Sequence, residues 1–194
     1  ASNYGVPQKR ERVFIVGSIL DKSFDFPKPK SKKVGSLIPR YTVGEAINSL
    51  IKENENFPNH DVLNHSEKVI ERYKLIQEGG KLPSPDNIPK SIRRKNFGST
   101  YQRLHRKKPS VTLVPGNNAF PIHPILNRSL TPREAARIQG FPDNHIFVGS
   151  RRMQCILVGN AVAPLLAANI GRHLKKYLSS DCFKETNTSL VRKR

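Results

Sequence analysis

The distribution of proline and charge divides this sequence into distinct parts, and that division constrains the fold more than any other feature. Residues 21–127 are rich in proline, lysine and arginine, whereas the segments on either side contain apolar runs typical of strands and helices. Because helix and strand signals alternate at both ends, we expect an α/β fold. We interpret the middle as an inserted or smaller second domain.

The apolar segments predict specific elements. Residues 12–20 (RVFIVGSIL) form a β-branched and aromatic run that predicts a buried strand, and residues 110–114 (SVTLV) predict another. Helices are expected where apolar residues recur with a helical period, in three cases directly after a serine or threonine that caps the first turn. These helices span residues 43–51, 67–78, 132–139 and 164–178.

The charge of the chain is strongly one-sided. Lysine and arginine number 34 against 15 acidic residues, which gives a formal net charge of +19. Residues 79–128 alone contain ten basic residues and one acidic residue, a net charge of +9. A block of this kind repels itself unless an anion is bound, so we expect a polyanionic partner, most simply nucleic acid.

Several other classes are disfavoured by the sequence. No apolar run approaches the roughly 18 residues of a membrane span, and no signal peptide opens the chain, so we expect no membrane partner. Cys155 and Cys182 are too few for a zinc site, and the histidines lack metal-ligand spacing, so no metal is expected. Met153 is the only methionine, so Ala1 follows either a removed initiator or a cut in a longer protein.

Three blocks of sequence carry a family resemblance. They are NYGVPQKRER at residues 3–12, RSLTPREAARIQGFPD at residues 128–143 and QCILVGNAVAP at residues 154–164. In this order they resemble the Q-x-R-x-R, R-E-x-A-R-x-Q-x-F-P and G-N-(S/A)-V-x-P motifs of the C-terminal part of DNA cytosine-5 methyltransferases. Each block is weak by itself, but the ordered set with a basic stretch between the first two is specific.

The resemblance implies a domain organisation. Residues 1–20 would supply a core strand with the first motif, and residues 128–178 would be helices that complete a Rossmann-like methyltransferase core. Residues 21–127 would be a small mixed α/β target-recognition domain inserted into that core. Residues 179–194 are expected to be a frayed basic tail.

The N-terminal motifs of the family are missing from this sequence. It contains no glycine-rich loop for S-adenosylmethionine and no Glu-Asn-Val motif, and neither cysteine follows a proline as the family's nucleophile does. We therefore expect a subunit of a split methyltransferase or a fragment of one, inactive by itself. Its partners would be double-stranded DNA and an N-terminal subunit that carries the Pro-Cys nucleophile. The expected location is the bacterial cytoplasm or nucleoid.

The resemblance also implies roles for the first and third motifs. The family adds a thiolate to C6 of a cytosine that has left the base stack and transfers a methyl group from S-adenosylmethionine to C5. Gln8, Arg10 and Arg12 would be catalytic, with Arg12 at the base and Arg10 supporting the pocket. Without the other motifs, these residues would be interpreted as a basic strand edge. Three residues before the last helix would close the cofactor pocket, or form an ordinary turn: Asn160, Ala161 and Val162.

The basic residues 79–128 would recognise the DNA target. Side chains there are suited to phosphate contacts or to base edges in the major groove, although phosphate contact is the commoner role of any single lysine or arginine. The candidates are Arg93, Arg94, Asn96, Gln102, Arg103, Arg106, Lys107 and Thr112. Two alternatives remain open at this point. One is a non-catalytic, sequence-specific DNA-binding module, and the other is a basic RNA-binding protein of the ribosomal type.

Overall fold

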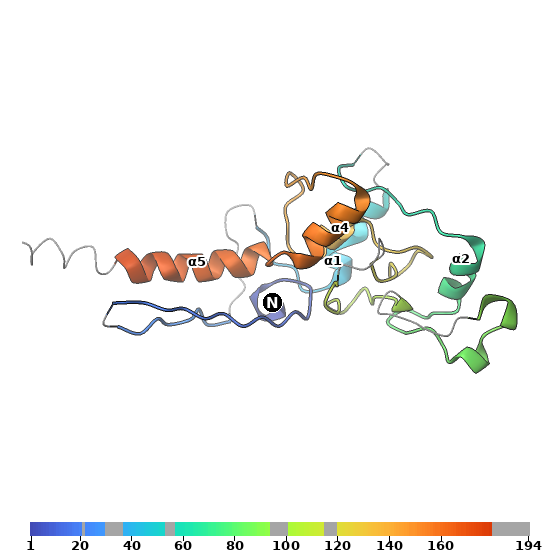
Figure 1. The fold of residues 1–194 in the computed structure, drawn as a ribbon, viewed down its shortest axis with the longest axis horizontal. Helices are drawn as coiled ribbons and strands as arrows, with labels where there is room; N and C mark the ends of the chain where they lie inside the picture. The colour runs from blue at the N-terminus through green and yellow to red at the C-terminus, as the bar shows by residue number, and fades with distance from the viewer. Residues whose placement is uncertain (21, 30–36, 53–56, 94–100, 115–119, 180–194) are drawn as a thin grey trace, which may run out of the picture.

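The computed structural model describes residues 1–20, 22–29, 37–52, 57–93, 101–114 and 120–179 (Figure 1). The α-helices within these ranges are α1 (Val43–Ile47), α2 (Glu67–Lys74), α3 (Pro132–Ile138), α4 (Arg151–Asn160) and α5 (Pro164–Ser179). Short 3-10 helices lie at η1 (Ser2–Tyr4), η2 (Asn48–Lys52), η3 (Pro85–Asn87) and η4 (Lys90–Ile92). Figure 1 shows α1 and α4 at the centre, α2 toward one end and α5 extending toward the other.

The helix starts follow from local capping. The hydroxyl of Thr131 accepts a hydrogen bond from the amide of Glu134, whose carboxylate accepts from the amide of Thr131 in return. This capping box begins α3, and Gly140 ends it with a φ of 85°. The hydroxyl of Thr42 accepts a hydrogen bond from the amide of Glu45 and so caps α1. The helices expected over residues 132–139 and 164–178 are therefore confirmed as α3 and α5.

Helix α2 is shorter than the sequence indicated, because it stops at Lys74 instead of reaching residue 78. The carbonyl oxygens of Tyr73 and Ile76 accept hydrogen bonds from the guanidinium of Arg103. These bonds hold the chain beyond α2 against another segment. Ser66 precedes α2, but its side chain makes no capping hydrogen bond.

The α/β class is not visible in this part of the molecule, since the described residues form helices and irregular segments with only isolated β-bridges. The strand predicted over residues 110–114 is reduced to a single bridge between Ser110 and Gln8. The buried strand predicted over residues 12–20 is also wrong for this chain. Val13, Ile15 and Ile19 are 88%, 92% and 104% exposed, because no described segment covers that side.

Three apolar clusters hold the described chain together. The largest lies where α1, α3 and α4 pack, and it includes Ile47, Ile138 and Val158. The second follows α5, where Val6 and Phe14 pack near Leu166 and Ile170. The third joins α2 to the central region; its buried members are Tyr73, Ile76, Tyr101 and Ile122.

The third motif lies at a break between two helices. We expected Gly159 and Asn160 to belong to a loop, but both are the last residues of α4, and only residues 161–163 separate it from α5. The two helices are bent by 42° at this break. No single helix among the described residues is long and apolar enough to span a membrane; α4 and α5 meet the length and composition criteria only when taken together as a bent pair.

Candidate functional site

The first and third motifs meet at Arg10. Its guanidinium Nη2 donates to the carbonyl of Gly159 over 2.8 Å, and Nη1 donates to the carbonyl of Leu113 over 3.5 Å. Arg10 is buried, and that burial, followed by the charge of Arg12, lowers the pKa of its guanidinium from the ordinary value. Every residue has a backbone carbonyl. The sequence therefore could not indicate that the carbonyls of Leu113 and Gly159 accept hydrogen bonds from Arg10.

Arg12 has a different environment, although it lies only two residues further along the chain. Its side chain is exposed, and Nη1 donates to the carbonyl of Glu11 over 2.6 Å. Arg10 and Arg12 nevertheless both line one hollow of about 230 Å³, which also touches Phe14 and Leu166. The hollow is therefore lined by one buried cation, Arg10, and one exposed cation, Arg12.

Gln8 is fully buried beside these arginines. The backbone on either side of it is paired with Ser110: the amide of Ser110 donates to the carbonyl of Pro7, and the carbonyl of Ser110 accepts from the amide of Lys9. Within the described part of the chain, neither the amide nitrogen nor the amide oxygen of the Gln8 side chain has a hydrogen-bond partner. A buried, unsatisfied amide is costly, and native proteins retain few of them.

The G-N-A-V segment differs in geometry from what the resemblance implied. Asn160 ends α4 instead of standing before a helix start, and its side chain is exposed. Ala161 donates its amide to the carbonyl of Val158, whereas the amides of Val162 and Ala163 make no hydrogen bond to the described residues. Ala163 is buried, but the backbone amide of the exposed Val162 and the exposed side-chain amide of Asn160 fit an acceptor group such as a carboxylate. No group of three histidine, cysteine, aspartate or glutamate residues suited to a metal is found among the described residues.

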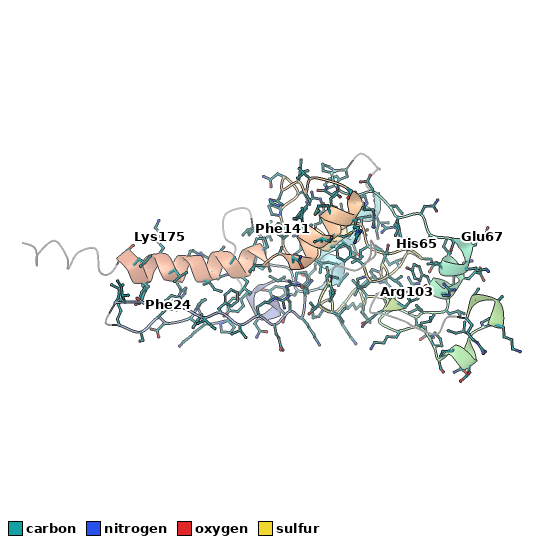
Figure 2. The ribbon with its side chains drawn as sticks, in the orientation of Figure 1. Phe24, His65, Glu67, Arg103, Phe141 and Lys175 are labelled. Atoms are coloured by element: carbon teal, nitrogen blue, oxygen red, sulfur yellow. The ribbon has the colours of Figure 1, made fainter. Side chains whose placement is uncertain are left out.

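Arg103 does not point to solvent, which corrects its assignment as a DNA contact. It is 4% exposed, and its donors reach backbone oxygens on two segments, residues 73–76 and 123–126, at 2.7 to 3.0 Å. The acceptors are the carbonyls of Tyr73, Ile76, His123 and Leu126, together with Oδ1 of Asn127. Figure 2 shows Arg103 in the α2 half of the molecule, far from Phe24 and Lys175 at the other end. Its role is to join these segments.

Arg106 is exposed but already paired. Its Nε and Nη2 each lie 3.0 Å from an oxygen of Glu78, and this pairing lowers the pKa of Glu78 to about 2. Arg93 and Lys107 are exposed, and Arg93 makes one long bond to the carbonyl of Ile88.

The remaining candidates for DNA contact are Gln102, Thr112, Arg94 and Asn96, and their environments differ. Gln102 is half-buried and its backbone bridges to Lys81. The hydroxyl of Thr112 donates to the carbonyl of Lys9, which joins this residue to the first motif. Arg94 and Asn96 lie outside the described residues.

Helix α3 carries the second motif in a buried polar network. The carboxylate of Glu134 accepts two hydrogen bonds from Arg128 at 2.7 and 2.8 Å. The fully buried Arg133 donates to the carbonyls of Pro58 and His145. These hydrogen bonds join α3 to the segments around it.

The chain is similar to known proteins of one family. The model of the C-5 cytosine-specific DNA methylase family matches residues 1–176. The chain is 36% identical over 181 residues to the type II methyltransferase M1.HphI of Haemophilus parahaemolyticus, covering 91% of this chain and 46% of that protein. It is 34% identical over 137 residues to M.AquIB of Picosynechococcus, covering 65% of this chain and 93% of that protein.

A solved structure of a DNA modification methyltransferase encoded within an E. coli prophage is 28% identical, with a TM-score of 0.48, and the match covers 92% of this chain and 46% of that one. The chain belongs to the C-5 cytosine-specific DNA methylase family. It spans about half the length of most of the curated relatives that it matches.

Proposed function

We propose that this chain is the C-terminal part of a DNA cytosine-5 methyltransferase, which reads double-stranded DNA and completes the active site. The contact between Arg10 and Gly159 carries this proposal, because it joins the first motif to the third around a hollow that contains Arg12. A second part, which carries the Pro-Cys nucleophile and most of the cofactor site, would supply the missing chemistry. By itself the chain is inactive.

Arg12 contacts the cytosine in this proposal. Negative charge grows on the pyrimidine ring, including O2, when a thiolate adds to C6, and a cation placed there stabilises the transition state more than the ground state. Arg10 supports the pocket wall, since its Nη1 and Nη2 already donate to backbone carbonyls. Gln8 is fully buried with neither amide atom bonded to a described residue, so in this proposal it contacts the second part or the base only after it becomes accessible in the complete enzyme.

S-adenosylmethionine supplies the methyl group when it is bound, mainly by the second part. The residues of this chain fit only one end of it. The exposed side-chain amide of Asn160 and the backbone amide of the exposed Val162 suit the carboxylate of a methionine moiety. Ala161 presents no hydroxyl, so the segment binds through backbone and amide groups.

The DNA is held by exposed basic side chains of the middle region, of which Arg93 and Lys107 are described. Arg94 and Asn96 remain candidates from the sequence. Arg103 and the paired Arg106 shape this region instead of contacting phosphate. The enzyme would act on chromosomal DNA in the cytoplasm or nucleoid of a bacterium, in a restriction-modification system like those to which type II methyltransferases belong.

One relative is itself a short chain, because the 137 residues matched in M.AquIB make up 93% of that protein. A natural two-chain enzyme and a piece of a longer protein both agree with the proposal.

The decisive experiment mixes this chain with an N-terminal part from the same source that carries the Pro-Cys motif, made as a separate polypeptide. Labelled S-adenosylmethionine and duplex DNA are then added. We expect methyl transfer to cytosine from the pair and none from either chain by itself. No transfer from the pair, or full activity from this chain, would overturn the proposal.

A non-catalytic DNA-binding module is the second candidate, favoured by the net charge of +9 in residues 79–128. It predicts salt-dependent binding to duplex DNA by the isolated chain. In the paired enzyme, Arg12→Ala separates the two: loss of methyl transfer with retained DNA binding rejects the module. Preference for RNA over duplex DNA would instead indicate an RNA-binding protein.

A further inference from the structure

The last carbonyls of α4 accept hydrogen bonds from side chains outside the helix. We propose that Gln139, directly after α3, is a positioning residue that keeps the backbone amide of Val162 free to bind the carboxylate of S-adenosylmethionine. It does so by occupying the carbonyl of Val158, which that amide would otherwise take. This inference rests on the proposed function, because it requires the cofactor, and it adds a residue of the second motif that acts on the cofactor segment.

Two motifs supply the donors at the end of α4. An α-helix leaves its last four carbonyls without intrahelical donors. In α4, the carbonyl of Val158 accepts from Nε2 of Gln139 over 2.8 Å, and the carbonyl of Gly159 accepts from Nη2 of Arg10 over 2.8 Å. Figure 1 shows α5 leaving this end of α4. The second and first motifs therefore hold two successive carbonyls of the third.

The bond from Gln139 takes the place of a helical bond. If α4 continued, the amide of Val162 would donate to the carbonyl of Val158, four residues earlier. Instead, this carbonyl accepts from Gln139 and, over 3.3 Å, from the amide of Ala161, while the amide of Val162 makes no hydrogen bond to the described residues. Alanine is the strongest helix former, and Pro164 restricts only the residue before it, so neither stops the helix at residue 161. The competing donor does.

Packing alone does not account for a glutamine at residue 139. Its side chain is fully buried, next to an apolar cluster that includes Ile138 and Val158. Its Oε1 has no hydrogen-bond partner among the described residues, and a buried polar atom without a partner costs free energy. A methionine would fill the same space without that cost. The bond from Nε2 to the carbonyl of Val158 is what glutamine adds here.

Gln139 acts through the backbone and touches no ligand itself. Val162 is exposed and lies two residues beyond Asn160, whose side-chain amide is also exposed. A backbone amide left free beside a side-chain amide offers two donors to one carboxylate. If the amide of Val162 were drawn into α4, one of these two donors would be lost.

The test compares two glutamines that hold opposite ends of α4. Gln139→Met removes the donor at the end of the helix, and Gln154→Met removes the bond from Nε2 of Gln154 to the carbonyl of Gly149, 2.8 Å long, near its start. In the full chain, we expect hydrogen exchange of the Val162 amide to be about tenfold slower in Gln139→Met, because this amide gains the carbonyl of Val158, and unchanged in Gln154→Met. A merely structural role would make the exchange faster. Faster or unchanged exchange would overturn the proposal.

The consequence for the cofactor is measured in the paired enzyme, made with an N-terminal part that carries the Pro-Cys motif. Gln139→Met should raise the calorimetric Kd for S-adenosylmethionine about tenfold. The kcat at saturating S-adenosylmethionine should stay within about threefold, because the lost interaction is one of binding. Adding Ala161→Gly, which opposes extension of α4, should recover about fivefold of the lost affinity. Glycine would not recover an affinity lost through misfolding.

The outcomes separate this inference from the proposed function. If the unchanged pair neither binds S-adenosylmethionine nor methylates DNA, the proposed function is wrong, and the cofactor role of Gln139 with it. If the unchanged pair is active and Gln139→Met binds S-adenosylmethionine equally well, only the positioning role is wrong. An equal loss of affinity in Gln154→Met would assign the effect to α4 as a whole and would also overturn the positioning role.

Discussion

Arg10 donates a hydrogen bond to the carbonyl of Gly159 over 2.8 Å, although 149 residues separate the two in the sequence. Arg12 belongs to the same motif, yet it is exposed, and the only hydrogen bond of its side chain within the described residues goes to the carbonyl of the preceding residue, Glu11. The two arginines therefore differ in environment, and we propose that Arg10 contributes to stability and Arg12 to chemistry.

Substitution should separate these roles. Arg10→Ala removes the donor to Gly159 and is expected to lower the free energy of unfolding of the isolated chain by about 1–3 kcal/mol. Arg12→Ala is expected to change it by less than about 0.5 kcal/mol. In the complete enzyme, Arg12→Ala should lower kcat roughly 100-fold or more. Urea unfolding and single-turnover methylation measure the two effects, and equal destabilisation by both variants would contradict this division.

Arg103 should behave as a structural residue. Arg103→Ala strands several carbonyls around a buried site, so we expect a loss of about 3 kcal/mol in urea unfolding. Lys107→Ala should leave stability unchanged and reduce the slope of log affinity against log salt for duplex DNA by about 1. A salt slope that is unchanged in Lys107→Ala would remove this residue from the DNA-contact set.

His123 should make stability depend on pH. Burial, opposed by Glu134, lowers the pKa of His123 to about 4, while Nδ1 accepts from the amides of Ile125 and Leu126. Between the unfolded pKa of about 6.5 and this value, the unfolded chain binds more protons, so stability falls as pH is lowered. The full effect is on the order of 3 kcal/mol.

His123→Asn keeps an acceptor but does not titrate, and it tests this prediction. The difference in the free energy of unfolding between pH 7 and pH 4.5 should be smaller in the variant than in the unchanged chain. It should not vanish, because burial also lowers the pKa of His60 and of His65. Identical pH profiles would show that His123 does not contribute.

The cap of α3 offers a local test. Thr131→Ala removes the acceptor for the amide of Glu134 and the contact with Nδ1 of His60 at 2.9 Å, so a loss of about 1–2 kcal/mol is expected. Thr131→Ser retains the hydroxyl and should lose much less. Thermal unfolding of both variants measures the difference, and an equal loss would assign the effect to the methyl group instead.

The sequence predicted those features that depend on neighbouring residues. The N-cap at Thr42, the capping box at Thr131 and the glycine that ends α3 are local, and the structure has helices there. The strand over residues 12–20 failed because burial of a strand depends on what lies beside it. In this chain, α5 supplies a cover for only one of its faces.

The candidate site could be predicted only in part for a related reason. Side-chain motifs identified the family, but the acceptors that fix Arg10 and Arg103 are backbone carbonyls, which every residue possesses. Basic residues in one segment look alike in sequence. In the structure, Arg103 is buried and joins separate segments, Arg106 forms an ion pair and Lys107 is exposed.

The contact between Arg10 and Gly159 also sets an order of events during synthesis. The ribosome adds residue 159 long after residue 10. The first motif therefore stays solvated, without its partner, until the intervening chain has been made. The contacts of Arg103 span 20 to 30 residues and form without that delay. Because distant contacts close slowly, the region around Arg103 should become ordered first, and the arginine hollow should be the last part to mature.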